Sequence, residues 1–176
     1  ARVNATTTDG TPPVFIGAYT PGLAQIDGTS FDIVTQLDEP GDVFYVVVKR
    51  TTEDPPTAPT AAETKSGNFT NVVACGTFDV ASADVNVTET VVTTANPESD
   101  PNCSPDNCSL CPLLDSESQY WVYLIAEDKE ATPNTQQVAT TRNVTTTDVT
   151  PPTFKNKTAS TLPVFVSSNA KALYAY

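Results

Sequence analysis

The chain has 176 residues, of which 39% are hydrophobic, and it carries a formal net charge of -12 at pH 7. This length suits one domain with a single core and leaves little for a second one. The strong negative charge disfavours nucleic acid and anionic membrane surfaces as partners, and the sequence has no apolar run of the roughly 18 residues that a membrane span requires.

The negative charge is unevenly distributed along the chain. Residues 153–176 contain three lysines and no acidic residue, a charge of +3, whereas residues 1–152 hold 6 basic and 21 acidic residues, a charge of -15. A cationic tail on an anionic body would attract a neighbouring copy of the chain.

A motif near the start of the chain returns near its other end. The segment 4–15 recurs as 143–154, with nine of twelve positions identical at a constant offset of 139 residues. Self-similarity at a fixed spacing is typical of repeat proteins. The sequence therefore predicts one repeat unit with borrowed ends, and it favours a structural role over an enzymatic one.

Alternating apolar residues predict strands along most of the chain, and helical patterns are nearly absent. Residues 31–37 and 43–49 predict a hairpin through the turn at residues 38–41. Further strands are expected at residues 78–80, 85–92, 120–126 and 137–147. Short strands with Pro and Gly turns predict an all-β fold, an antiparallel sandwich.

Two long segments are expected to be loops, residues 50–70 and residues 94–115, because they are rich in Pro, Thr, Ser and Asn. The first contains a Pro/Thr/Ala tract at residues 55–62. Such a tract is typical of extended, O-glycosylated stalks, and the alternative is a flexible loop.

One strand carries a family resemblance. The spacing of five core residues resembles the Leu-x5-Tyr-x-Val-x-Val-x-Ala segment of fibronectin type III and related immunoglobulin-like domains: Leu114, Tyr120, Val122, Leu124 and Ala126. The resemblance implies an immunoglobulin-like sandwich in which the Tyr120 hydroxyl bonds back to the preceding loop. The tryptophan usual in the early strands of the family is missing, and Phe31 is its expected replacement.

The repeated Asp-x-Thr-Pro-Pro-x-Phe opening is similar to the start of tandem extracellular immunoglobulin-like repeats. The resemblance covers residues 13–149, which we expect to form the sandwich. Residues 1–12 are then an N-terminal extension that copies the last strand, and residues 150–176 are a C-terminal extension. The overall character also resembles algal and other microbial surface or filament glycoproteins.

Seven of the eleven asparagines stand in Asn-x-Ser/Thr contexts, more than the Ser and Thr content would give by chance. They are Asn4, Asn68, Asn86, Asn102, Asn107, Asn143 and Asn156. This excess predicts a secreted, extracellular protein at the cell surface or in a released filament, with covalent N-linked glycans.

The four cysteines admit three interpretations: Cys75, Cys103, Cys108 and Cys111. They could bind zinc together, or the last two could form a redox pair, but these sites need a reducing compartment or a βαβ context. Two disulfides are favoured because the glycosylation sites imply the secretory route. We expect Cys75 to join one of the three loop cysteines and the other two to pair.

The sequence has few of the residues that catalysis usually requires. The chain has no histidine, which removes Ser-His-Asp and Cys-His catalysis and the usual zinc-hydrolase ligands. The acids at residues 127–130 could serve a glycosidase, and residues 126–128 resemble the calcium motif of cadherins without its companion acidic linker. We predict no enzyme, no catalytic or cofactor-binding residue, and no metal site.

The strand at residues 120–126 is apolar on both faces, because Trp121, Tyr123 and Ile125 alternate with the core positions. The outer face is expected either to lie under a long loop or to be exposed as a platform for a sugar or a neighbouring subunit.

The tail has its own strand-like alternation, with one apolar face: Leu162, Val164, Val166, Ala170, Ala172, Tyr174 and Tyr176. Either both ends belong to neighbouring repeats on one backbone, or separate subunits each lend a terminal strand to the next. A third interpretation folds the tail back onto its own domain. Strand donation best explains the charge and composition of the tail, and it would propagate into a filament.

These patterns together predict a structural subunit of a secreted, glycosylated extracellular filament or surface array, which assembles head to tail with copies of itself. The alternative is a carbohydrate- or protein-binding module of a surface adhesin, acting through the Trp121 face or the long loops.

Overall fold

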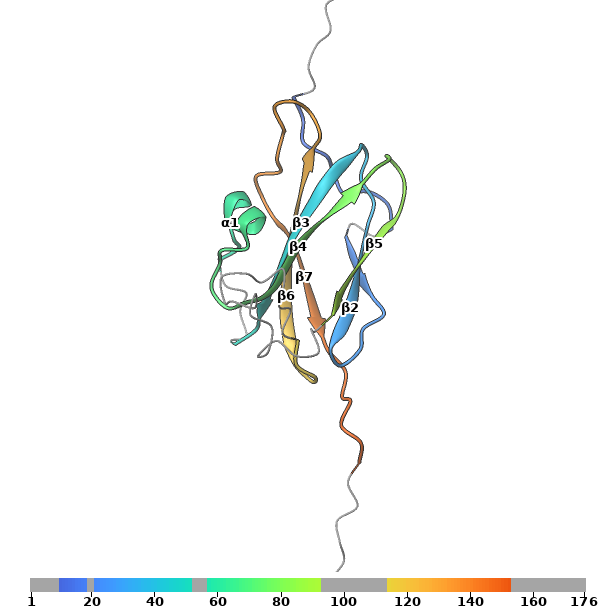
Figure 1. Ribbon diagram of the computed structural model, residues 1–176, viewed down its shortest axis with the longest axis vertical. Helices are drawn as coiled ribbons and strands as arrows, with labels where there is room; N and C mark the ends of the chain where they lie inside the picture. The colour runs from blue at the N-terminus through green and yellow to red at the C-terminus, as the bar shows by residue number, and fades with distance from the viewer. Residues whose placement is uncertain (1–9, 19–20, 52–56, 93–113, 153–176) are drawn as a thin grey trace, which may run out of the picture.

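The computed structural model describes residues 10–18, 21–51, 57–92 and 114–152. Within these ranges the chain forms seven strands and one helix: β1 (Gly22–Ala24), β2 (Ser30–Thr35), β3 (Gly41–Lys49), α1 (Ala61–Ser66), β4 (Val72–Val80), β5 (Val87–Val92), β6 (Gln119–Asp128) and β7 (Thr140–Thr145). The strands make two antiparallel sheets that pack face to face (Figure 1). The all-β prediction is confirmed.

The two sheets differ in size. Three strands form one sheet in the order β1-β2-β5, and four form the other in the order β4-β3-β6-β7. The predicted hairpin of β2 and β3 is wrong, because β2 pairs with β1 and β5 whereas β3 pairs with β4 and β6. The turn between them carries the chain from one sheet to the other. Alternation shows which face of a strand is buried but not which strand lies beside it.

The hydrophobic core lies between the sheets. Alternate residues of β2 point inward, so that Phe31 and Ile33 are fully buried, and β3 and β6 add the facing side chains. The five residues of the predicted Leu-x5-Tyr pattern all belong to this core: Leu114, Tyr120, Val122, Leu124 and Ala126. Burial of each large side chain contributes about 1.5 to 3 kcal/mol.

A helix interrupts the segment that was expected to be a loop, and this part of the prediction is wrong. Thr60 caps α1 in a capping box: its side chain accepts a hydrogen bond from the Glu63 backbone, and the Glu63 carboxylate accepts one from the Thr60 backbone. Gly67 ends the helix with φ of 69°. Residues 61–62 of the Pro/Thr/Ala tract therefore begin a helix, and Thr60 is its N-cap. The Thr-x-x-Glu spacing is the overlooked sequence signal.

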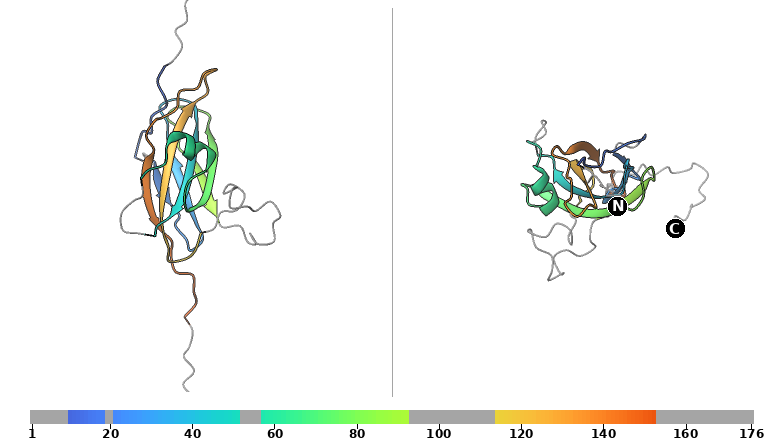
Figure 2. Two further views of the ribbon diagram at one scale, coloured as in Figure 1. Left: turned by 90° about the vertical axis from the view of Figure 1, so that its left-hand side faces the viewer. Right: turned by 90° about the horizontal axis from the view of Figure 1, so that it is seen from above.

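The helix lies across the outer face of the four-stranded sheet (Figure 2). Lys65 bonds to Glu127 of β6 at 2.5 Å, and its ammonium group stands 5.1 Å from the centre of the Phe44 ring of β3. Thr64 is the buried residue of the helix. Among the described residues, no helix is long and apolar enough to cross a membrane.

β4 is longer than the strand predicted at residues 78–80, because burial along β4 does not follow a regular alternation. The pairing of β3 with β4 shifts between Val47 and Val48, which breaks the alternation of burial along β4. Gly76 allows Tyr45 to lie against the backbone, since a Cβ at residue 76 would stand 2.6 Å from the Tyr45 hydroxyl. β1 escaped prediction because a strand of three residues is too short for a pattern.

We predict that Thr60→Ala lowers the free energy of unfolding by about 1 kcal/mol, because the first turn of α1 loses its capping oxygen. Thr60→Ser is the matched control, since it keeps that oxygen, and it should unfold close to the unmodified protein. Chemical denaturation measures both variants. Equal losses in the two would contradict the capping role.

Candidate functional site

The repeated motif occupies the two opposite ends of the sandwich. The structure describes residues 10–15 of the first copy and residues 143–152 of the second. Figure 1 shows the chain entering at the upper end and leaving at the lower end, along the long axis of the molecule. Any connection between successive copies would therefore be made at these ends.

At the upper end the chain is fixed from Pro13 onwards. The Pro13 carbonyl accepts a hydrogen bond of 2.6 Å from the Gln136 side chain. Val14 is held through its backbone by Asp38, whose carboxylate accepts from the Val14 N–H at 2.7 Å and whose own N–H donates to the Val14 carbonyl. Phe15 bridges to Leu37 and is buried. The Pro-Pro-x-Phe motif is thus the anchor of the entering chain.

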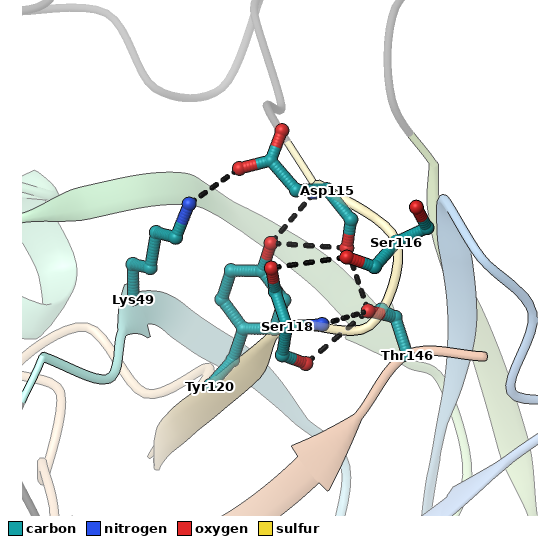
Figure 3. Close-up of polar contacts among 6 residues, drawn as sticks. All are labelled: Lys49, Asp115, Ser116, Ser118, Tyr120 and Thr146. Atoms are coloured by element: carbon teal, nitrogen blue, oxygen red, sulfur yellow. Dashed lines mark hydrogen bonds and ion pairs between the residues drawn. The ribbon is translucent and has the colours of Figure 1, made fainter. Parts of the chain in front are cut away.

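At the lower end Tyr120 locks the turn that precedes β6 (Figure 3). Its hydroxyl accepts a 2.6 Å hydrogen bond from the Asp115 backbone N–H and donates a longer one to the Asp115 carbonyl. The Tyr120 side chain is fully buried. The hydrogen bond to the preceding loop that the resemblance implied for Tyr120 is therefore present.

Thr146 ties the leaving chain to the same turn. Its hydroxyl donates to the Asp115 carbonyl at 2.6 Å and accepts from the Ser118 backbone N–H at 3.0 Å (Figure 3). The next residue, Thr147, donates its N–H to the Asp27 carbonyl. Sequence patterns missed Thr146, because it stands in a run of threonines that alternate between exposed and buried positions.

Lys49 of β3 adds an ion pair to this turn, 2.5 Å from the Asp115 carboxylate. The hydrogen bond that Lys49 donates to the Asp115 carboxylate, together with the charge of that carboxylate, raises the pKa of Lys49. Because both side chains are largely exposed, the pair contributes little to stability. The backbone hydrogen bonds made by Tyr120 and Thr146 therefore fix the turn.

Beyond Thr147, Val149 lies close to the body of the sandwich. A Cβ on Gly28 would stand 2.2 Å from a methyl group of Val149, so only glycine allows this approach. Asp148 folds the segment locally, because its carboxylate accepts from the Thr150 N–H at 2.7 Å and from the Thr150 hydroxyl. These two bonds lower the pKa of Asp148.

Three of the seven predicted glycosylation sites lie in the described residues: Asn68, Asn86 and Asn143. All three are exposed. Asn68 follows α1, Asn86 precedes β5, and Asn143 lies on β7. The other four sites, Asn4, Asn102, Asn107 and Asn156, fall outside the described residues, as do the predicted assembly residues Leu162, Val164, Val166, Ala170, Ala172, Tyr174 and Tyr176.

Cys75 lies on β4, opposite Val46 in the strand pairing, and it is not a free thiol. Its three predicted partners, Cys103, Cys108 and Cys111, fall outside the described residues. The pairing of the four cysteines stays a prediction.

Two of the three carboxylates at residues 127–130, those of Glu127 and Asp128, are engaged in hydrogen bonds within the fold. Asp128 accepts from the backbone N–H groups of Glu130 and Asn134, and so shapes the loop after β6. Partial burial of Glu127 raises its pKa, but hydrogen bonds from Lys65 and Thr135 outweigh this and lower it overall. Throughout the described part of the chain, no three His, Cys, Asp or Glu side chains are grouped to hold a metal ion.

The outer face of β6 is largely covered. Tyr123 and Ile125 are buried in a second apolar cluster, where the Phe69 ring packs edge-on against Tyr123 with ring centres 6.5 Å apart. Trp121 packs at the border of this cluster and remains partly exposed. Arg50 places its guanidinium 5.2 Å from the centre of the indole ring.

Comparison of the chain with protein-family models, with curated proteins and with solved structures found no match.

We predict that Tyr120→Phe lowers the free energy of unfolding by about 1 kcal/mol, because the Asp115 N–H loses its acceptor in a partly buried setting. Tyr123→Phe is the matched control. The Tyr123 hydroxyl is buried and has no hydrogen-bond partner among the described residues, so its removal should leave stability unchanged or raise it slightly. Denaturant titration measures both, and equal losses would show that the hydroxyl bond of Tyr120 does not lock the turn.

Proposed function

We propose that this chain is a structural unit of a secreted, N-glycosylated extracellular filament or surface array, which joins head to tail with copies of itself through its terminal segments. The observation that carries the proposal is the placement of the repeated motif. One copy anchors the chain at the upper end of the sandwich, and the other leaves from the lower end (Figure 1). Units that repeat this motif would follow one another along the long axis.

An immunoglobulin-like fold of the fibronectin type III kind is part of this proposal. Two observations support it: the division of strands into β1-β2-β5 and β4-β3-β6-β7, and the bond of the Tyr120 hydroxyl to the turn before its strand. Phe31 fills a fully buried core position on β2, where it takes the place of the tryptophan of that family.

The joint between successive units would be short. Among the residues that the structure describes, Thr147 is the last that hydrogen-bonds to the body of the sandwich, and Pro152 corresponds to the anchored Pro13 at the offset of 139. Only residues 148–151 lie between them. Five residue steps reach about 18 Å at most, so the lower end of one unit would stand close to the upper end of the next.

The tail carries the pattern of the entering strands. At the same offset Ala170, Ala172, Tyr174 and Tyr176 correspond to Phe31, Ile33, Thr35 and Leu37, which are all fully buried in this sandwich. On one backbone, we infer that the tail takes the place of β2 in the next repeat. Between separate subunits, residues 30–35 of the receiving copy already fill that place, so the donated tail would lie along a sheet edge or groove of that copy. The positive charge of the tail favours this second route.

A binding module acting through the Trp121 face is the weaker candidate. Two of the three aromatic or aliphatic side chains on that face of β6, Tyr123 and Ile125, are buried. The remaining exposed area around Trp121 is small for a platform that would bind a partner on its own.

We predict that deletion of residues 153–176 abolishes polymerisation, because the tail supplies the strand that enters the next unit. Electron microscopy of the secreted protein measures this. Ala172→Asp should weaken assembly, since it places a charge on the apolar face, whereas Asn169→Asp, the matched control on the polar face, should assemble. Filaments that persist after the deletion would refute strand donation, and a monomeric binding module would keep its ligand affinity.

We also predict that the secreted protein loses mass on glycosidase treatment and that glycopeptides contain Asn68, Asn86 and Asn143, which are exposed. Intact-mass spectrometry and peptide mapping measure occupancy. A secreted chain without sugar at any site would contradict the extracellular glycoprotein proposal.

A further inference from the structure

Asn143 and Trp121 are direct partners across two paired strands. β6 and β7 are antiparallel, and their register sets Trp121 opposite Asn143. Side chains at opposed positions lie on the same face of a sheet, with Cβ atoms about 4.5 to 5.5 Å apart. Both therefore project from the outer face of the four-stranded sheet, one as the acceptor of a glycan and the other as a large aromatic ring.

The neighbours of Asn143 on its own strand are small. β7 is an edge strand, and its outward positions next to Asn143 are the small residues Thr141 and Thr145. Figure 2 shows β7 at the margin of the sheet, with α1 lying over other strands. A group attached to Asn143 is therefore flanked by small side chains on β7 and by the large ring of Trp121 on β6.

Trp121 is a large aromatic side chain that the described residues cover only in part. It packs against the outer apolar cluster, and the Arg50 guanidinium stands 5.2 Å from the centre of its ring, yet the indole remains partly exposed. The C–H face of a pyranose ring is apolar enough to stack on the exposed part of the indole.

We propose that the first N-acetylglucosamine of a glycan on Asn143 packs against Trp121 and completes the outer face of the sheet. The inference rests on the proposed N-glycosylation and assigns to Trp121 a place in it. Asn86, by contrast, lies in the turn before β5, a strand of the three-stranded sheet. The glycan would also shield β7, whose free edge could otherwise pair with another strand.

The test uses the fluorescence of Trp121, which is the single tryptophan of the chain. Thr145→Val removes the glycosylation context of Asn143 and keeps the asparagine, whereas Thr88→Val does the same for Asn86. In the secreted glycoprotein, Thr145→Val should increase acrylamide quenching of Trp121 and shift its emission to longer wavelength. Thr88→Val should change neither. When made without glycosylation, Thr145→Val and the unmodified protein should quench alike.

Peptide mapping separates failure of this inference from failure of the proposed function. A glycan on Asn143 whose loss leaves Trp121 quenching unchanged would overturn the stacking, as would an empty Asn143 in a protein glycosylated elsewhere. Absence of sugar from every site would overturn the glycoprotein proposal as well. In a second measurement, Trp121→Ala should speed the enzymatic release of the Asn143 glycan and leave release from Asn86 unchanged; equal release rates would contradict the packing.

Discussion

Burial of β6 on both of its faces is the constraint around which this fold is arranged. Its inner side chains, including Tyr120 and Leu124, complete the core between the sheets. Its outer ones, Tyr123 and Ile125, would be an apolar surface in water without α1 and Phe69. A free apolar stripe of this kind invites aggregation. The segment between β3 and β4 is therefore long because it must return across the sheet and cover this face.

Strands β6 and β7 connect the lower end of the sandwich with the outer face of the four-stranded sheet. At the lower end, Tyr120 and Thr146 fix the turn and the leaving chain through shared hydrogen bonds to Asp115. Further along the same pair of strands, Trp121 and Asn143 stand opposite each other on the outer face. Because β6 and β7 are rigidly paired, the direction of the leaving chain and the position of the proposed glycan would be set together.

The sequence predicted individual strands well and their partners poorly. Alternation identified the buried face of β2 and β6, because burial depends on the side chains of the strand itself. The false hairpin between β2 and β3 arose because pairing depends on the whole sandwich. The helix that begins after Thr60 was not predicted, because its residues show no apolar periodicity. Its capping pair, Thr60 and Glu63, was the signal present in the sequence. The approach of Val149 to Gly28 could not be predicted, since it joins residues far apart in sequence.

The opposite placement of the two ends has a mechanical consequence. Tension applied along the long axis would pull β7 parallel to its own length against β6, and so load its six paired positions in shear rather than one after another. The entering chain is held over a longer stretch, by the hydrogen bonds of Pro13 and Val14, the bridge at Phe15 and the three paired residues of β1. A pulling force along the long axis would therefore be carried at the lower end by the ladder between β6 and β7, and at the upper end by these contacts.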